Sequence, residues 1–482
     1  MRRIFVMALG AMVLAGCGAD SDEAARDGGA DAGGAPWHGG ERYATVGENP
    51  FVDTAQDARA TFGVDVDTAS YAIMRRDVRA GFLPVPAGVR VEEYVNYFSY
   101  GYAPPAGDEA FAVDLEAAPS PFGEGLHLLR VGLQARTVEE RGRANLVFLV
   151  DVSGSMSEEL PLVARTLEIL LDELRPDDRV ALVAYAGAVG TVLEPTPASE
   201  RETIRAAIGR LSSGGSTNGE GGIRAAYALA EKHLDRSGIN RVILCTDGDF
   251  NVGLVGDPLI DLVEEKRAGG VYLTTLGFGA GNYNDAGMEA LADRGNGNYA
   301  YVDGEGEALR VVRRDLLSTM VVVAEDTKVQ IEFDPAVVKR YRLLGYENRA
   351  IADDDFENDV DTGDVGAGHD VTALLELELQ PGALDADAPL ASLALRYRLP
   401  GGSADVERTH VLRTGDVRAT FDDASPATRF AAAVAEYAEI LRRSAHSEGA
   451  RFADVRAIAE PLVGEDADRA EFLELLDLAA TR

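Results

Sequence analysis

The sequence predicts an α/β protein, in which a doubly wound, mostly parallel sheet is inserted into a β-sandwich and helical segments lie toward both ends of the chain. In the middle of the chain, wholly apolar strand candidates alternate with amphipathic helices, which is typical of a parallel sheet that helices cover on both faces. On both sides of that segment, apolar and polar residues alternate with a period of two, as in half-buried strands. From Pro426 onward the pattern is helical.

Helix candidates lie between the strand candidates of the middle segment. Strands are predicted at Leu146–Val150, Val180–Tyr185, Val242–Cys245 and Val271–Leu276. Helices are predicted at Leu160–Leu174, Glu200–Leu211, Gly221–Leu234 and Asp257–Lys266. In such sheets, ligands bind beyond the carboxyl ends of the strands. A ligand site is therefore expected just after Val150, around Thr217 and after Thr246.

The flanking segments predict strands at residues 111–117, 126–135, Lys328–Phe333, Thr372–Leu379, Leu393–Tyr397 and Thr409–Leu412. Residues 56–105 instead predict a small helical unit, with one helix ending near Arg79 and another at Val91–Phe98. Asp65 and Asp67 are interpreted as capping side chains of the first helix, with metal ligation as the alternative. We hypothesise that the strands before and after the α/β unit pair with one another.

Charge is the outlying property of the 482-residue chain. Asp and Glu number 81 against 46 Lys and Arg, which gives a formal net charge of -35. A surface this acidic repels phosphate backbones, so a nucleic-acid partner is not expected, and it favours the capture of divalent cations. The two cysteines, Cys17 and Cys245, are too few for a disulfide scaffold.

Residues 1–16 have the features of a lipoprotein signal peptide. A short basic start and an apolar run, Ile4–Ala15, lead into Leu14-Ala15-Gly16-Cys17. This ending resembles the bacterial lipobox, which implies cleavage before Cys17 and lipidation of that residue; an ordinary secretory signal is the alternative. Residues 17–55 would then hold the lipidated Cys and a flexible, Gly- and Ala-rich stalk. The expected location is the bacterial cell envelope, and Gly18 favours the outer membrane where there are two.

Three separate segments bring oxygen-bearing side chains to the predicted carboxyl edge of the sheet. They are Asp151-Val152-Ser153-Gly154-Ser155, Thr217 in a glycine-rich turn, and Asp247. Two carboxylates and three hydroxyls, without Cys or His, suit Mg²⁺, Mn²⁺ or Ca²⁺ rather than zinc. The alternative is a Ser-rich turn and a helix cap that bind no metal.

These segments resemble the metal-ion-dependent adhesion site of von Willebrand factor type A (VWA) domains, whose pattern is D-x-S-x-S, then T, then D. The resemblance implies that Asp151, Ser153, Ser155, Thr217 and Asp247 hold the metal, and that an Asp or Glu of a protein partner completes its coordination. FGVDVDTASYAIMRRDV near residue 62, VRVEEYVNYF near residue 89 and YRLLGYENRAIADDDF near residue 341 are similar to segments of bacterial VWA lipoproteins.

That resemblance implies three regions after the stalk. Residues 56–140 would form an N-terminal helical segment with strands, residues 141–322 the VWA domain, and residues 323–482 a β-rich domain of unknown function that ends in helices. The expected function is that of a membrane-anchored binding protein and not of an enzyme. A metal-dependent hydrolase or chelatase-associated subunit is one alternative, and a structural envelope protein with a fold-stabilising metal is another.

Four further features carry weaker signals. The acidic loop Asp353–Asp364 is interpreted as solvated, with calcium binding as the alternative. Glu220 is expected to face solvent in the first turn of a helix rather than the metal. Asp249 is placed at the rim of the site or in a turn, and the Gly277–Gly281 turn lacks the full dinucleotide-binding pattern.

Overall fold

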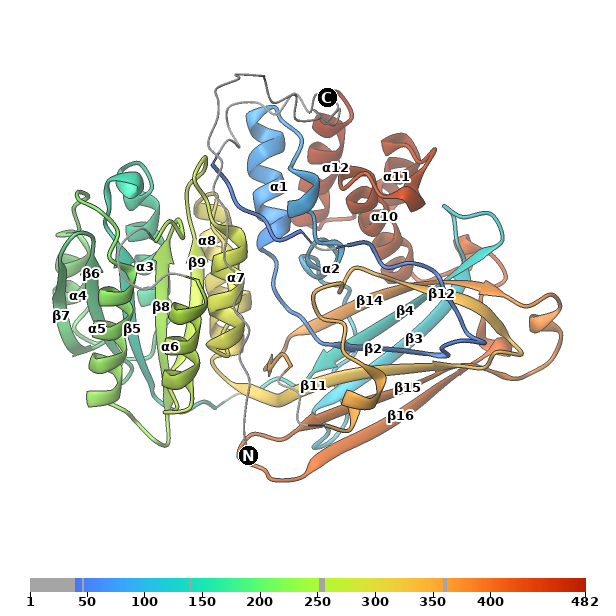
Figure 1. The fold of residues 1–482 in the computed structure, drawn as a ribbon, viewed down its shortest axis with the longest axis horizontal. Coiled ribbons are helices and arrows are strands. Elements are labelled where there is room, and N and C mark those ends of the chain that lie inside the picture. The colour runs from blue at the N-terminus through green and yellow to red at the C-terminus, as the bar shows by residue number, and fades with distance from the viewer. Residues whose placement is uncertain (1–39, 46, 139, 251–255, 359–361) are drawn as a thin grey trace, which may run out of the picture.

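The computed structural model describes residues 40–45, 47–138, 140–250, 256–358 and 362–482, which form three sheets and a group of helices (Figure 1). The signal peptide, Cys17 and much of the stalk therefore lie outside the described residues. Within the described residues, no helix has both the length and the apolar character that a membrane span requires.

The six-stranded sheet confirms the predicted α/β unit. Its strand order is β10 (Tyr299–Tyr301), β9 (Tyr272–Gly277), β8 (Ile239–Thr246), β5 (Ala144–Asp151), β6 (Arg179–Tyr185) and β7 (Val189–Pro197). All neighbouring pairs are parallel except β6 with β7. The carboxyl ends of β5, β6, β8 and β9 therefore meet at one edge of the sheet.

Strand β5 explains why the middle strands are apolar throughout. Leu146, Phe148 and Val150 belong to one hydrophobic core, whereas Val147 and Leu149 belong to a second core on the opposite face. The helices of this unit are α3 (Leu160–Glu173), α4 (Arg201–Ile208), α5 (Gly219–Lys232), α6 (Asp257–Arg267), α7 (Asp285–Arg294) and α8 (Glu305–Arg310), followed by a π-helical turn at Val311–Leu316 and α9 (Leu317–Thr319). A strand buried on both faces has no position for an alternating polar residue.

Two antiparallel sheets form the sandwich, and their pairing confirms that the flanking strands meet. One sheet has the order β1 (Val52–Asp53), β12 (Val338–Leu344), β14 (Asp370–Leu379), β4 (Leu126–Ala135) and β3 (Phe111–Pro119). The other has the order β13 (Val365–Gly366), β11 (Val322–Phe333), β15 (Pro389–Arg398) and β16 (Asp405–Arg413), with β2 (Arg59–Gly63) also paired to β11. Strand β4 pairs with β14 from Leu126 opposite Glu378 to Gln134 opposite Asp370, so segments on either side of the α/β unit share a sheet.

A helical layer covers the outer face of the first sandwich sheet. It consists of α1 (Ala69–Ala80), α2 (Val91–Asn96), α10 (Pro426–Leu441), α11 (Phe452–Ala459) and α12 (Ala467–Ala479). Their aromatic and aliphatic side chains pack on Leu128, Leu344 and Leu374 of the sheet. Figure 1 shows this layer above the sandwich, with α1 next to the α/β unit.

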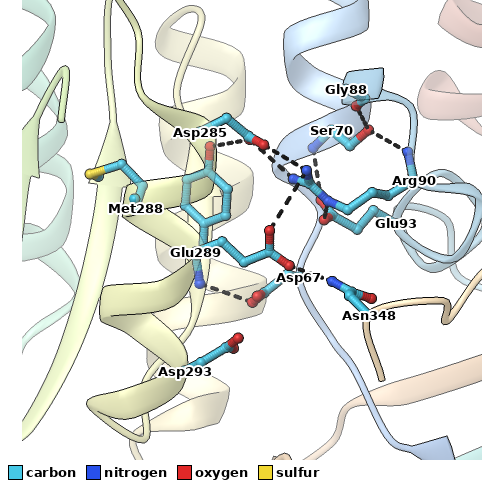
Figure 2. A network of polar contacts seen from close by, with 12 residues as sticks. Asp67, Ser70, Gly88, Arg90, Glu93, Asp285, Met288, Glu289, Asp293 and Asn348 are labelled. Atoms are coloured by element: carbon cyan, nitrogen blue, oxygen red, sulfur yellow. Dashed lines mark hydrogen bonds and ion pairs between the residues drawn. The ribbon is translucent and has the colours of Figure 1, made fainter. Parts of the chain in front are cut away.

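A buried polar network joins that helical layer to the α/β unit (Figure 2). Arg90 donates to both oxygens of Asp285, the first residue of α7, at 2.6 and 3.1 Å. Glu93 accepts the backbone N–H of Ser70 at 2.7 Å. Tyr299 donates its hydroxyl to Asp285 at 2.7 Å. Both members of the Arg90–Asp285 pair are almost fully buried, so neither charge is compensated by water.

The structure corrects two expectations. Residues 59–63, expected in a helical unit, form strand β2 because their apolar side chains enter the sandwich core. Asp65 and Asp67 do not cap α1, whose N-cap Thr68 makes no capping hydrogen bond. Asp65 instead pairs with Arg349 at 3.1 Å, and Asp67 accepts the backbone N–H of Tyr299 at 2.9 Å.

Replacement of Asp285 by alanine tests the buried pair. Arg90 would keep its ion pair with Glu93 but lose both hydrogen bonds to Asp285, so we expect Asp285→Ala to lower the free energy of unfolding by about 2–3 kcal/mol, measured by urea denaturation. The double variant Arg90→Met/Asp285→Ala should lose less than the sum of the two single losses. Strictly additive losses would show that the two side chains do not stabilise one another.

Candidate metal centre

Two carboxylates lie at the carboxyl ends of neighbouring parallel strands. Asp151 is the last residue of β5, and Asp247 directly follows the last residue of β8. Val150 is opposite Cys245 in the ladder between these strands, so Asp151 and Asp247 are one step apart along the edge. Both side chains are buried.

The Asp151 carboxylate is fixed by two donors. Its Oδ1 accepts the backbone N–H of Ser153 at 2.8 Å, and its Oδ2 accepts the hydroxyl of Thr246 at 2.8 Å. The hydroxyl oxygens of Ser153 and Ser155 are 3.1 Å apart in the turn that follows. Ser153 is buried and Ser155 is exposed, so the turn runs from the sheet edge to the surface.

The loop that carries Thr217 is tied to this turn through its backbone. Gly214 donates to the carbonyl of Val152 at 2.7 Å, and Gly154 donates to the carbonyl of Gly215 at 3.2 Å. Gly215 has a φ of 94°, a left-handed conformation that side-chain-bearing residues rarely adopt. The buried Thr217 is thereby placed beside the Asp151–Ser155 turn, just before helix α5 begins.

Asp247 is held from the other side by residues that the sequence patterns did not identify. Asn282 donates its side-chain amide to Asp247 Oδ2 at 3.1 Å, and the backbone N–H of Asn284 donates to the Asp247 carbonyl at 3.1 Å. Thr246 links the two carboxylate segments, because its hydroxyl donates to Asp151 and accepts from the N–H of Gly248. The sequence could have indicated these two asparagines, because they lie in a turn just after β9, and that turn is at the same carboxyl edge of the sheet as Asp247.

Electrostatics and donor chemistry both fit a divalent cation. Burial raises the pKa of Asp151, and the charge of Asp247 raises it further. Among the described residues, neither carboxylate forms an ion pair with Lys or Arg. The same residues contain no group of three or more His, Cys, Asp or Glu side chains suited to a metal. A cation at this edge would therefore depend on the hydroxyls of Ser153, Ser155 and Thr217 as well as on the two carboxylates.

The weaker candidates lie around this centre or away from it. Glu220 accepts a hydrogen bond from Arg224 at 2.8 Å, one turn further along α5. Asp249 lies at the rim, where its N–H donates to Asp247 Oδ1 at 3.1 Å. In the Gly277–Gly281 turn, Gly277 is required by packing, because a Cβ at this position would be 1.8 Å from the Tyr283 hydroxyl. The acidic loop lies elsewhere, with Asp353 bonded to Thr61, and its residues 359–361 are outside the described set.

Comparisons with known proteins agree with this architecture. A family model described as "von Willebrand factor type A domain" matches residues 145–314, one described as "von Willebrand factor" matches residues 38–130, and one described as "Uncharacterized protein YfbK, C-terminal" matches residues 318–481. The Escherichia coli K12 protein YfbK is 41% identical over 473 residues, which cover 92% of this chain and 81% of that protein. Protein sll0103 of Synechocystis is 28% identical over 198 residues, covering 41% of this chain and 46% of that protein.

Among solved structures, the von Willebrand factor type A protein of Catenulispora acidiphila is 16% identical, with a TM-score of 0.45 and coverage of 79% of this chain and 91% of that chain. The family assignment rests on the extended sequence identity and on the three matched segments. The chain belongs to the family of the bacterial protein YfbK, whose members carry a von Willebrand factor type A domain.

Proposed function

We propose that this protein is a lipid-anchored component of the bacterial envelope, in which the VWA domain binds a protein partner through a divalent cation, with Mg²⁺ as the first candidate. The partner would offer an Asp or Glu side chain to the cation. Asp151, Ser153, Ser155, Thr217 and Asp247 would hold the cation, and the surface around them would select the partner.

The observation that supports this proposal is the pair of buried carboxylates, Asp151 and Asp247. Among the described residues, no basic side chain forms an ion pair with either of them. Two negative charges in a buried edge repel one another, and a cation between them would remove that cost. Hydroxyl ligands add no negative charge, so the cation would retain positive charge toward the outside. The exposure of Ser155 leaves the site accessible to the surface of another protein.

Metal binding can be tested through thermal stability. The melting temperature of the wild type should rise on addition of MgCl₂ or MnCl₂, because a ligand at 100 times its Kd stabilises the folded state by about 2.7 kcal/mol. Asp151→Asn should remove this response. Without metal, the same variant should melt at or above the wild-type temperature, because it relieves the repulsion with Asp247.

The matched control is Asp261→Asn, which changes an exposed carboxylate on α6. It should keep the full response to metal. An Asp151→Asn variant that responds to Mg²⁺ like the wild type would exclude a metal site at this edge. An unfolded Asp151→Asn variant would instead support a purely structural metal.

Partner binding requires a separate test with envelope extract. The full chain should capture a partner in Mg²⁺, and EDTA or Ser155→Ala should reduce the captured amount by at least tenfold. Ser155 is exposed, so its replacement should leave the fold intact, which circular dichroism checks. Equal capture with and without metal would assign binding to the flanking regions and contradict metal-dependent adhesion.

The anchor is tested by replacing the predicted lipidation site. In cells, Cys17→Ser should move the protein from the membrane fraction to the soluble fraction, because the acyl chains supply the attachment. Cys245→Ser is the control, since this thiol is buried in the sheet. Retention of the Cys17→Ser protein on membranes would require another mode of attachment.

A further inference from the structure

Strand β16 has one open edge. It pairs with β15 along nine residues, and within the described part of the chain no strand pairs with its other side. The backbone N–H of Thr414 donates to Ala388 at 2.9 Å, in the direction of β15. Since successive backbone groups of a strand point to opposite sides, the N–H and C=O groups of Glu407, Thr409 and Val411 point away from β15. Figure 1 shows β16 at the outer margin of the sandwich.

A groove of about 410 Å³ lies elsewhere, between the α/β unit and the sandwich, but the larger groove of about 890 Å³ runs beside β16. Val113 and Leu115 of β3 and Leu412 of β16 line it. Strand β3 is the edge of the other sheet, and Arg418 donates to its Ala117 carbonyl at one end. The groove therefore offers an open strand edge beside a wall that is apolar at Val113 and Leu115 and charged at Glu116 and Arg418, and an added β-strand can occupy such an edge.

The sequence of β16 is complementary to itself when two copies run antiparallel about Thr409. In that register Asp405 is opposite Arg413, and symmetry repeats this pair of opposite charges. Val406 is opposite Leu412, again twice, and Thr409 is opposite its own copy. Opposite-charge, apolar and Thr–Thr pairs are each favourable across antiparallel strands.

The remaining pairs are compatible with this register. Glu407 is opposite Val411, whose side chain is 50% exposed in the single chain and would be covered by the Glu407 methylene groups. Arg408 is opposite His410. Burial lowers the pKa of His410, the charge of Arg408 lowers it further and Glu109 raises it in part, so a second positive charge beside the arginine is disfavoured.

Neighbouring registers are poorer. A register centred on Arg408 places Asp405 opposite Val411 and removes the charge pair. A register centred on His410 keeps a Glu407–Arg413 pair but places Arg408 opposite Leu412 and His410 opposite itself. A shift by a single residue would place residues whose backbone groups point outward opposite residues whose groups point toward β15, so the inter-strand hydrogen bonds would not form. Charges on an edge strand usually prevent pairing with other chains, whereas here one register pairs two of the four charged residues, Asp405 and Arg413.

We propose that β16 is a homodimerisation edge, at which two copies of this chain pair antiparallel about Thr409 and join their β11–β15–β16 sheets into one continuous sheet. The occupant of the edge is a second copy of the same strand. This proposal does not depend on the metal site.

The experiment uses the full chain with Cys17→Ser and a cysteine introduced at Thr409. Two copies of residue 409 would face one another with Cα atoms about 5.5 Å apart, within disulfide range. Mild oxidation at micromolar concentration should therefore give a covalent dimer in more than half of the chains. The remaining native thiol, Cys245, is buried, and burial raises its pKa to about 12, so it should not react.

Glu407→Cys on the same background is the matched control. In the proposed register, residue 407 of one copy and residue 407 of the other lie four residues apart along the strands. This distance of about 13 Å is too long for a disulfide. Adding Val411→Cys to Glu407→Cys should restore the cross-link, because these positions face one another in the proposed register.

The charge pair tests the register. Within one chain Asp405 pairs with Arg396 at 2.7 Å and Arg413 with Asp387 at 2.8 Å, so each charge swap is combined with Arg396→Gln and Asp387→Asn. On that background, with Thr409→Cys as the reporter, Asp405→Arg or Arg413→Asp alone should reduce the cross-link yield at least tenfold, and the two together should restore it. Failure of Thr409→Cys to cross-link above the Glu407→Cys level, or lack of rescue by the charge swap, would overturn the proposal. The proposal would also be overturned if the wild-type chain stayed monomeric at 100 times the concentration used for cross-linking and a synthetic strand of another sequence occupied the edge instead.

Discussion

The parallel pairing of β5 with β6 and β8 is the constraint on which both cores of the α/β unit and the candidate metal centre depend. Parallel strands end at the same edge of the sheet. The residues that follow β5 and β8 therefore lie side by side, although they are far apart in the sequence. The same pairing buries β5 on both faces, which fixes the direction of Asp151 at its end. A shift of β8 against β5 would separate Asp247 from Asp151 and expose the Thr246 hydroxyl that joins them.

The α/β unit is continuous in the chain, whereas the sandwich is not. Strands β2 and β4 precede the unit, and their partners β11 and β14 follow it. The sandwich therefore closes only after the whole α/β segment is present, and its contacts are long-range. The Arg90–Asp285 pair joins the helical layer on the sandwich to the α/β unit at the start of α7, close to Asn284, which is bonded to Asp247. The candidate metal centre is thus supported partly by residues outside the α/β unit.

The sequence predicted those features that depend on residues close together in the chain, and it did not predict those that depend on distant residues. Apolar runs such as Leu146–Val150 report burial directly, and the rule for strand ends was enough to bring Asp151, Thr217 and Asp247 to one edge. Strand β2 was missed because five residues inside a helix-like segment carry too short a pattern, and its burial comes from β11, more than 250 residues later. Asp65 and Asp67 were misassigned for a related reason. Capping is local, whereas their partners Arg349 and Tyr299 are distant in sequence.

Dimerisation through β16 would lower the affinity that each proposed metal site needs in order to hold a partner. A chain of net charge -35 repels an acidic protein at long range, so a single contact through the proposed cation would have to overcome that field. Strand β16 belongs to the sandwich and the proposed metal edge to the six-stranded sheet, which lies beside the sandwich in Figure 1, so pairing through β16 would not use the proposed metal edge. A partner surface that presents several carboxylates would then meet two sites on one particle. The second contact would form at an effective concentration near the millimolar range, which raises overall affinity by about 10²–10⁴ without any new interaction at either metal. Weak single contacts would suffice, and each would remain reversible on removal of the metal.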